Sequence, residues 1–187
     1  MTNAFIRIWK GKQTLEVFSL EDHAFRKIGG GIISGTIDNV ALLMKYQINM
    51  NENFQIESVK IELLGSPNRF LFLSSDSFGR WFNEYNKHLP ELDGCLVIDI
   101  SATPFTKTLA IKNLGNGKKG WDLLNVVYIK IPELKASRVA HEYAKISERH
   151  YHFYNLNSGF QSEMLIDEND LVISYMHLFE LIYFADR

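Results

Sequence analysis

Residues 94–114, with the sequence GCLVIDISATPFTKTLAIKNL, carry the strongest structural signal in the chain. Two runs of apolar and β-branched residues, 96–101 and 108–114, flank the corner at 103–106, and we expect both runs to be strands. A proline fixes φ and cannot donate to a strand ladder, so Pro104 suits a bend between strands. No catalytic signature accompanies the stretch.

The two threonines of this corner allow two interpretations. In the first, the hydroxyls of Thr103 and Thr106 bond the backbone groups that the bend leaves free. In the second, the corner lines the mouth of a cavity, and the hydroxyls point at the polar head of a ligand. We favour the first, structural role.

The rest of the chain mostly alternates between apolar and polar residues, as half-buried strands do. Residues 54–63, with the sequence FQIESVKIEL, show this most clearly. Short helices or turns are expected in 76–88 and 137–147. Many short strands in one chain predict a mainly β fold, a single domain over 1–187, with a strongly curved antiparallel sheet or an incompletely closed barrel and a few short helices. The other expected strands are 15–20, 32–37, 40–50, 69–73, 126–131, 151–155, 161–166 and 171–175.

One internal similarity suggests two duplicated halves. Residues 49–57 (NMNENFQIE) and 155–163 (NLNSGFQSE) agree at five of nine aligned positions. A true duplication predicts two related half-sheets around a shared interior. The alternative is that Asn-rich hairpin turns recur by chance.

Composition excludes some classes of function. The net charge is −2, whereas a dedicated nucleic-acid binder needs a basic stripe, so we expect no nucleic-acid partner. Cys95 is the single cysteine, which excludes an intramolecular disulfide and favours a reducing compartment. The chain shows neither a signal peptide nor an apolar run long enough to cross a bilayer, so a cytoplasmic location is expected.

Motifs of catalysis or cofactor binding are weak. Residues 115–120 match G-x-G-x-x-G, but strand-like residues follow where a dinucleotide site needs a helix, so a surface hairpin loop is expected. His150 and His152 would share one face of a strand, and a metal would need a third ligand such as His141. Neither a cofactor, a metal nor a catalytic set is predicted.

Asp99 is the carboxylate of most interest. If its side chain faces inward, it is a buried polar group that needs partners, for which Thr103, Thr106 or a neighbouring strand would serve. A structural hydrogen-bonding role is favoured over a catalytic or ligand-binding one.

A set of segments spread over most of the chain carries a family resemblance. These segments are Trp9, Glu16, 29–35, Tyr46, 79–81, 94–109, 127–134, Tyr143, 159–167, 171–172, Tyr175 and Phe179. Together they resemble the Putative glycolipid-binding family, a group of small bacterial proteins of undetermined function. The resemblance implies a β-rich, incompletely closed barrel like the carriers of bacterial lipoproteins. Lys107 stands where the family pattern has Asn, and the two arginines of the pattern are reduced to Lys112.

The leading hypothesis is therefore binding of an amphipathic small molecule, such as a glycolipid, without catalysis. Its apolar part would occupy the concavity of the sheet, and its polar part would lie near 103–112. Two alternatives stay open: an enzyme on a glycan or lipid-linked substrate, with Asp99 and Glu163 as acid and base, and a homodimeric scaffold. The predicted ligand-binding residues are Tyr46, Trp81, Asp99, Thr103, Thr106, Lys112, Trp121 and Tyr128.

Overall fold

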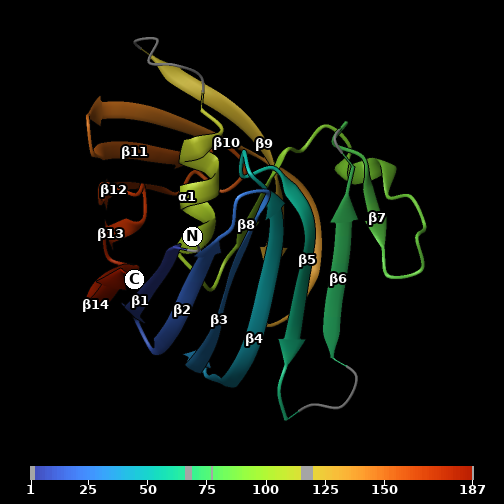
Figure 1. Ribbon diagram of the computed structural model, residues 1–187, viewed down its shortest axis with the longest axis horizontal. Helices are drawn as coiled ribbons and strands as arrows, with labels where there is room; N and C mark the ends of the chain where they lie inside the picture. Colours follow the sequence, from blue (N-terminus) through green and yellow to red (C-terminus); the bar gives the residue numbers. More distant parts are fainter. Residues whose placement is uncertain (1–2, 66–68, 77, 115–119, 187) are drawn as a thin grey trace.

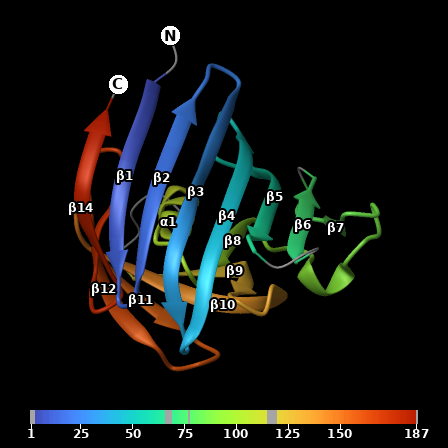
Figure 2. The ribbon, with the colours of Figure 1, turned by 90° about the horizontal axis from the view of Figure 1, so that it is seen from below.

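The computed structural model describes residues 3–65, 69–76, 78–114 and 120–186. Its strands form one curved sheet that wraps around the helix α1 (Figures 1 and 2). The predicted mainly β fold with a strongly curved sheet is confirmed. The strands are β1 (Asn3–Gly11), β2 (Thr14–Asp22), β3 (Arg26–Ile37), β4 (Val40–Asn51), β5 (Ile56–Leu63), β6 (Phe70–Ser75), β7 (Trp81–Asn83), β8 (Val97–Ile100), β9 (Trp121–Lys130), β10 (Lys135–Ser147), β11 (His150–Asn155), β12 (Gln161–Ile166), β13 (Val172–Tyr175) and β14 (Phe179–Asp186), and the helical elements are a 3-10 turn (Pro90–Leu92) and α1 (Phe105–Lys112).

The sheet follows the chain in two meanders that meet at β1 and β14. The strand order is β7-β6-β5-β4-β3-β2-β1-β14-β13-β12-β11-β10-β9-β8, so β7 and β8, which are neighbours in sequence, form the two edges. All described pairs of strands are antiparallel except β8 with β9. The sheet is therefore mixed, and it curls almost into a ring without closing.

Side-chain and backbone hydrogen bonds hold the two edges together in place of a ladder. The indole N–H of Trp81 donates to the carbonyl of Cys95 over 2.8 Å, and Gly94 N–H donates to the carbonyl of Gly79 over 3.0 Å. Both glycines have positive φ, a conformation that side chains disfavour. These two hydrogen bonds therefore tie the segment around β7 to the segment that leads into β8, beside the gap between the edges of the sheet.

The inner face of the sheet forms the core through the alternation that the sequence predicts. In β4, every second residue from Leu42 to Met50 is buried, and in β2 the buried residues are Glu16, Phe18 and Leu20. The edge strand β8 departs from this pattern because all four of its residues are buried. Asp99 therefore faces the interior, although Ile98 and Ile100 are buried as well.

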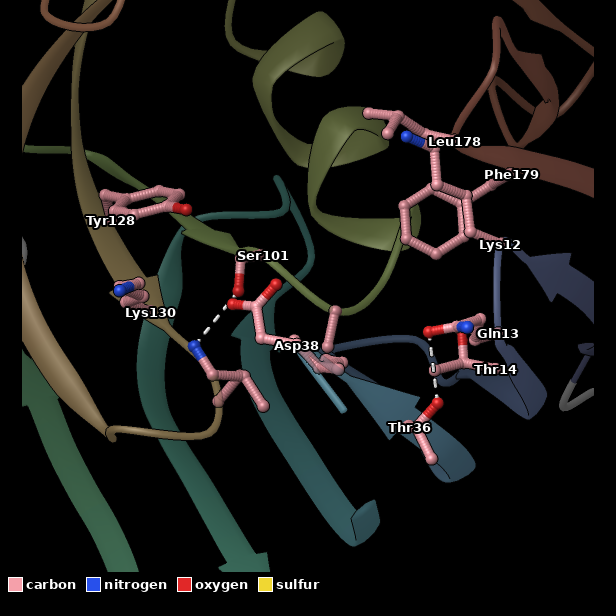
Figure 3. A pocket seen from close by; sticks show the side chains of 13 residues that line it. Lys12, Gln13, Thr14, Thr36, Asp38, Ser101, Tyr128, Lys130, Leu178 and Phe179 are labelled. Carbon is pink, nitrogen blue, oxygen red and sulfur yellow. Dashed lines mark hydrogen bonds between the residues drawn. The ribbon is translucent and has the colours of Figure 1, made fainter. Parts of the chain in front are cut away.

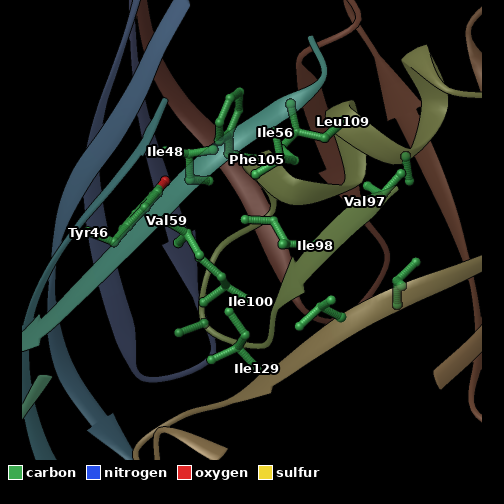
Figure 4. Packing of buried hydrophobic residues seen from close by; sticks show 14 of the residues in the cluster. Tyr46, Ile48, Ile56, Val59, Val97, Ile98, Ile100, Phe105, Leu109 and Ile129 are labelled. Atoms are coloured by element: carbon green, nitrogen blue, oxygen red, sulfur yellow. The ribbon is translucent and has the colours of Figure 1, made fainter. Parts of the chain in front are cut away.

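The expected strand over 108–114 is wrong: these residues belong mainly to α1. Seven consecutive residues, Phe105 to Ile111, are buried, so the helix has no polar face that could reveal its period. Figure 4 shows Phe105 and Leu109 among the side chains of Ile48 and Ile56 from the sheet. The helix therefore fills the centre of the concavity, where the ligand's apolar part was expected.

The threonine prediction for the corner is confirmed. Thr103 Oγ1 accepts from Phe105 N–H over 3.2 Å, and Thr106 Oγ1 accepts from Ile100 N–H over 3.2 Å. The bend after Pro104 leads into a helix rather than into a second strand.

Of the two segments expected to hold short helices or turns, the first holds turns, and the second is a strand. Residues 76–88, of which 77 lies outside the described residues, hold turns and β7, and 137–147 belong to β10. The loop expected over 115–120 falls almost wholly on residues that the structure does not describe.

The two similar segments are both hairpin turns. Asn51 Oδ1 accepts from the N–H groups of Asn53 and Gln55, and Asn155 Oδ1 accepts from those of Asn157 and Ser158. By these hydrogen bonds, Asn51 is the structural counterpart of Asn155. The sequence alignment instead pairs Asn155 with Asn49, two positions earlier. The hairpins β4–β5 and β11–β12 stand seven strands apart, as a duplication predicts, and duplication stays a prediction.

Candidate functional site

Two adjoining clefts lie beside the first turn of α1. The outer chamber, of about 320 Å³, is bordered by the β1–β2 and β3–β4 turns and includes Lys12, Thr14, Asp38 and Lys130 (Figure 3). The inner chamber, of about 270 Å³, includes Asp99, Thr103, Lys107, Phe153, Phe160 and Tyr175. The two chambers share the lining residues Ser101, Tyr128, Leu178 and Phe179.

A buried ion pair lies at the wall of the inner chamber. Lys107 Nζ donates to Asp99 Oδ2 over 2.8 Å, and Thr106 Oγ1 donates to Asp99 Oδ1 over 3.1 Å. Thr106 is one of the partners that the sequence predicts for Asp99. Burial raises the pKa of Asp99, but Lys107, His141 and Thr106 together bring it below its ordinary value. The carboxylate is therefore ionised and neutralised by its lysine.

Aromatic rings surround the cation of this pair. Lys107 Nζ lies 3.8 Å from the ring centroid of Phe153 and 5.6 Å from that of Tyr175. A desolvated ammonium over aromatic faces gains about 2 kcal/mol from the ring quadrupole. Burial lowers the pKa of Lys107, and the Asp99 carboxylate offsets only part of this effect.

Two polar side chains near the ion pair have no hydrogen-bond partner among the described residues. They are His141, through both ring nitrogens, and Tyr143, through its hydroxyl. His141 Nδ1 lies 3.7 Å from Asp99 Oδ2, and burial lowers the pKa of the imidazole to about 4, so the ring is neutral. Buried polar groups are normally paired, so these two side chains are exceptions, and neither residue is among those that line the two chambers.

A second polar group joins the corner to the sheet. Glu16 Oε1 accepts from Tyr46 Oη over 2.5 Å and from Thr103 Oγ1 over 2.9 Å. Burial raises the pKa of Glu16 to about 8, so its carboxyl group is neutral at pH 7. The structure thus brings the predicted residues Tyr46 and Thr103 within 3.1 Å of each other.

Of the eight predicted ligand-binding residues, three line the inner chamber: Asp99, Thr103 and Tyr128. Tyr46 and Thr106 lie outside the lining of this chamber and hydrogen-bond to Thr103 and Asp99, respectively. The remaining three lie elsewhere. Trp81 fastens the sheet edges, Lys112 pairs with Asp170 over 2.7 Å at the far end of α1, and the ring of Trp121 lies tilted against that of His152.

Sequence reasoning missed Lys107 and His141 as members of the site. The alternation of Val139, His141 and Tyr143 was the available signal, because these three residues share the buried face of β10. The helical interpretation of 137–147 concealed it. Lys107 was missed because it falls between the expected corner at 103–106 and the expected strand over 108–114, whereas the structure places it in the first turn of α1.

Two arrangements that the sequence left open, paired carboxylates and a three-ligand metal site, do not form among the described residues. Glu163 pairs with His150 over 2.9 Å on the half-exposed face of β12, and Asp99 lies inside, so the two carboxylates do not converge. No group of three metal-ligating side chains is present in the described part of the chain. Burial raises the pKa of the Cys95 thiol to about 11, which suits a buried, unreactive side chain.

No helix within the described ranges is both long and apolar enough to span a bilayer.

Comparisons with known proteins agree with the architecture. The model of the family described as Putative glycolipid-binding matches residues 7–180. The chain is similar to the crystal structure of a DUF1089 family protein from Pseudomonas aeruginosa, with 27% sequence identity and a TM-score of 0.78, covering 91% of this chain and 93% of that one. No curated protein matches.

Proposed function

Because this chain belongs to the Putative glycolipid-binding family, we propose that it binds a small amphipathic molecule, such as a glycolipid, in the inner and outer chambers. The observation that carries the proposal is the inner chamber itself, an open cleft with aromatic walls and a neutralised ion pair. Ligand sites are mostly apolar and hold a few fixed polar groups, which is the composition found here.

Charge supports a neutral, hydroxyl-bearing head group. Asp99 and Lys107 cancel each other, so the chamber offers neither a free cation to an anion nor a free anion to a cation. A hydroxyl group can both donate and accept, which suits a wall that includes Asn155, Ser158 and Ser101.

The volumes limit how much ligand is enclosed. Small-molecule pockets span about 300–1,000 Å³, and the two chambers together fall in the middle of that range. Since α1 fills the centre of the concavity of the sheet, we propose that the two chambers enclose the head group and the adjoining part of an acyl chain. The rest of a longer acyl chain would stay outside. The free thiol of Cys95 fits a cytoplasmic location, which we include in the proposal.

Calorimetric titration with octyl glucoside tests this function. We expect saturable binding, and Phe160→Ala should weaken it about tenfold, because an aromatic side chain in the wall of a cleft contributes about 1–2 kcal/mol. Phe25→Ala is the matched control: Phe25 is 85% exposed and lines neither chamber. Absence of binding, or equal weakening in both variants, would overturn the proposal.

A second candidate function is a homodimeric scaffold. Tyr183, Ile8, Val17 and Ile32 oppose one another across four strands on the outer face, and three of them are about half exposed. Such a row resembles an interface core more than a free surface. Light scattering after size exclusion separates the candidates, because Val17→Lys should convert a dimer into a monomer and leave a monomer unchanged.

A further inference from the structure

Lys107 combines features that are unusual for a lysine. Its side chain is almost fully buried, yet its ammonium lies at the wall of the inner chamber. Lysines rarely become buried unless they are paired, and a desolvated lysine in an apolar pocket is also a common way to obtain a nucleophilic amine. The other lysines that line the two chambers, Lys12 and Lys130, are exposed at the outer rim.

We propose that Lys107 is a covalent anchoring site that forms an imine with a small apolar or amphipathic aldehyde in the inner chamber. The inference rests on the proposed function, because the aldehyde must enter the cleft assigned to the ligand.

The reaction is balanced without a further reactant. The Lys107 ammonium releases one proton, its nitrogen bonds the aldehyde carbon, and the resulting carbinolamine takes up one proton and loses water. The C=O bond of the aldehyde is thus replaced by a C=N bond. The products are a protonated imine and one water molecule, so neither oxidation nor reduction occurs.

The surroundings of Lys107 suit the product as well as the free amine. Both the ammonium and the protonated imine carry one positive charge, so the ion pair with Asp99 at 2.8 Å is conserved. The faces of Phe153 and Tyr175 attract either cation. The reaction therefore avoids the large cost of leaving a buried carboxylate unpaired.

The proton of the first step leaves to solvent. Asp99 Oδ2 lies 2.8 Å from Lys107 Nζ and 3.7 Å from His141 Nδ1, so the carboxylate stands between the ammonium and the imidazole. With its pKa lowered to about 4, the imidazole is too weak a base to take this proton. Water in the open inner chamber accepts the proton and supplies one when the carbinolamine loses water.

Burial also favours reactivity. The pKa of Lys107 is lowered, whereas the carboxylate of Glu133 raises the pKa of Lys130. Each unit of difference in pKa changes the fraction of neutral amine about tenfold. Lys130 is therefore a suitable internal reference for the reactivity of an exposed lysine.

Reductive trapping tests the proposal. The full chain is incubated at neutral pH with hexanal and sodium cyanoborohydride, and the modified lysines are located by peptide mass spectrometry. We expect Lys107 to be labelled at least about tenfold faster than Lys130, and octyl glucoside to compete with this labelling. Labelling of Lys107 no faster than that of Lys130 would overturn the proposal.

Two variants separate anchoring from structure. Lys107→Arg keeps the charge beside Asp99 but cannot form the imine, so labelling in the inner chamber should disappear while the thermal unfolding midpoint changes little. Lys60→Arg is the control, because Lys60 is exposed and lines neither chamber, and it should leave labelling at position 107 unchanged. Octyl glucoside binding is measured on the same preparations: if it persists while Lys107 stays unlabelled, only the imine is refuted, and if it is absent, the proposed function fails too.

Discussion

Replacement of Glu16 by glutamine should make the protein more stable in alkaline solution. Glu16 is 2% exposed, and burial raises the pKa of its carboxyl group from 4.5 to about 8. A group with a raised pKa contributes stability that is complete below its unfolded pKa and is lost as the pH rises through its folded pKa. For Glu16 the loss therefore runs from about pH 4.5 to about pH 8.

The size of the loss follows from the shift. Each unit of pKa corresponds to about 1.4 kcal/mol, so the unfolding free energy falls by about 3 kcal/mol by pH 7, where only the unfolded chain is ionised at this position, and by about 5 kcal/mol above pH 8. This is a large part of the roughly 5–15 kcal/mol that is typical of a domain. In the Glu16→Gln variant, the side-chain amide would keep an acceptor for Tyr46 and Thr103 and would have no proton to lose.

Urea unfolding, followed by tryptophan fluorescence between about pH 5 and pH 9, measures the effect. The difference between Glu16→Gln and the parent should be near zero at the acidic end and should grow to several kcal/mol at the alkaline end. His141, with its pKa lowered to about 4, contributes the opposite slope below about pH 6.5, but it is present in both proteins and cancels in the difference. A difference that does not change with pH would refute the neutral carboxyl group.

Three further predictions concern the ion pair, the sheet edges and the helix. Asp99→Asn leaves its buried lysine partner without a counter-charge and should cost about 3–5 kcal/mol in urea unfolding. Trp81→Phe removes the hydrogen bond to the carbonyl of Cys95, should cost about 1–3 kcal/mol, and should speed amide exchange beside the sheet gap. Gly29→Ala places a methyl group against the ring of Phe105 and should cost about 1–3 kcal/mol in thermal unfolding.

Each of these predictions has a clear contrary outcome. An unchanged unfolding midpoint in Asp99→Asn would mean that the pair is not buried. Unchanged exchange in Trp81→Phe would mean that the indole does not fasten the edges. An unchanged thermal unfolding midpoint in Gly29→Ala would mean that α1 does not pack tightly against β3.

The strands were predictable because their surroundings differ on the two faces of the sheet. Strand β4 is buried at every second residue and exposed between, which is what period-two alternation reports. The same principle failed for α1. Phe105 to Ile111 are all buried, and they include the polar residues Thr106, Lys107 and Thr108. The alternation of polar and apolar residues therefore does not report the period of the helix.

The candidate site was predictable only where its residues belong to a local motif. Thr103 and Thr106 follow from the proline corner, and the need of Asp99 for partners follows from the cost of burying a carboxylate. The contact between Asp99 and His141 joins β8 to β10, and neither strand's own pattern specifies it. Lys107 approaches Asp99 only because the intervening chain becomes a helix that turns back over β8.

Native mass spectrometry of the protein purified from cells tests ligand binding most directly. We expect a fraction of the protein to carry an adduct whose organic extract contains an amphipathic, hydroxyl-bearing molecule, and we expect Phe160→Ala to carry less of it than Phe25→Ala. A bare polypeptide mass that persists after incubation with a lipid extract would contradict binding in the two chambers.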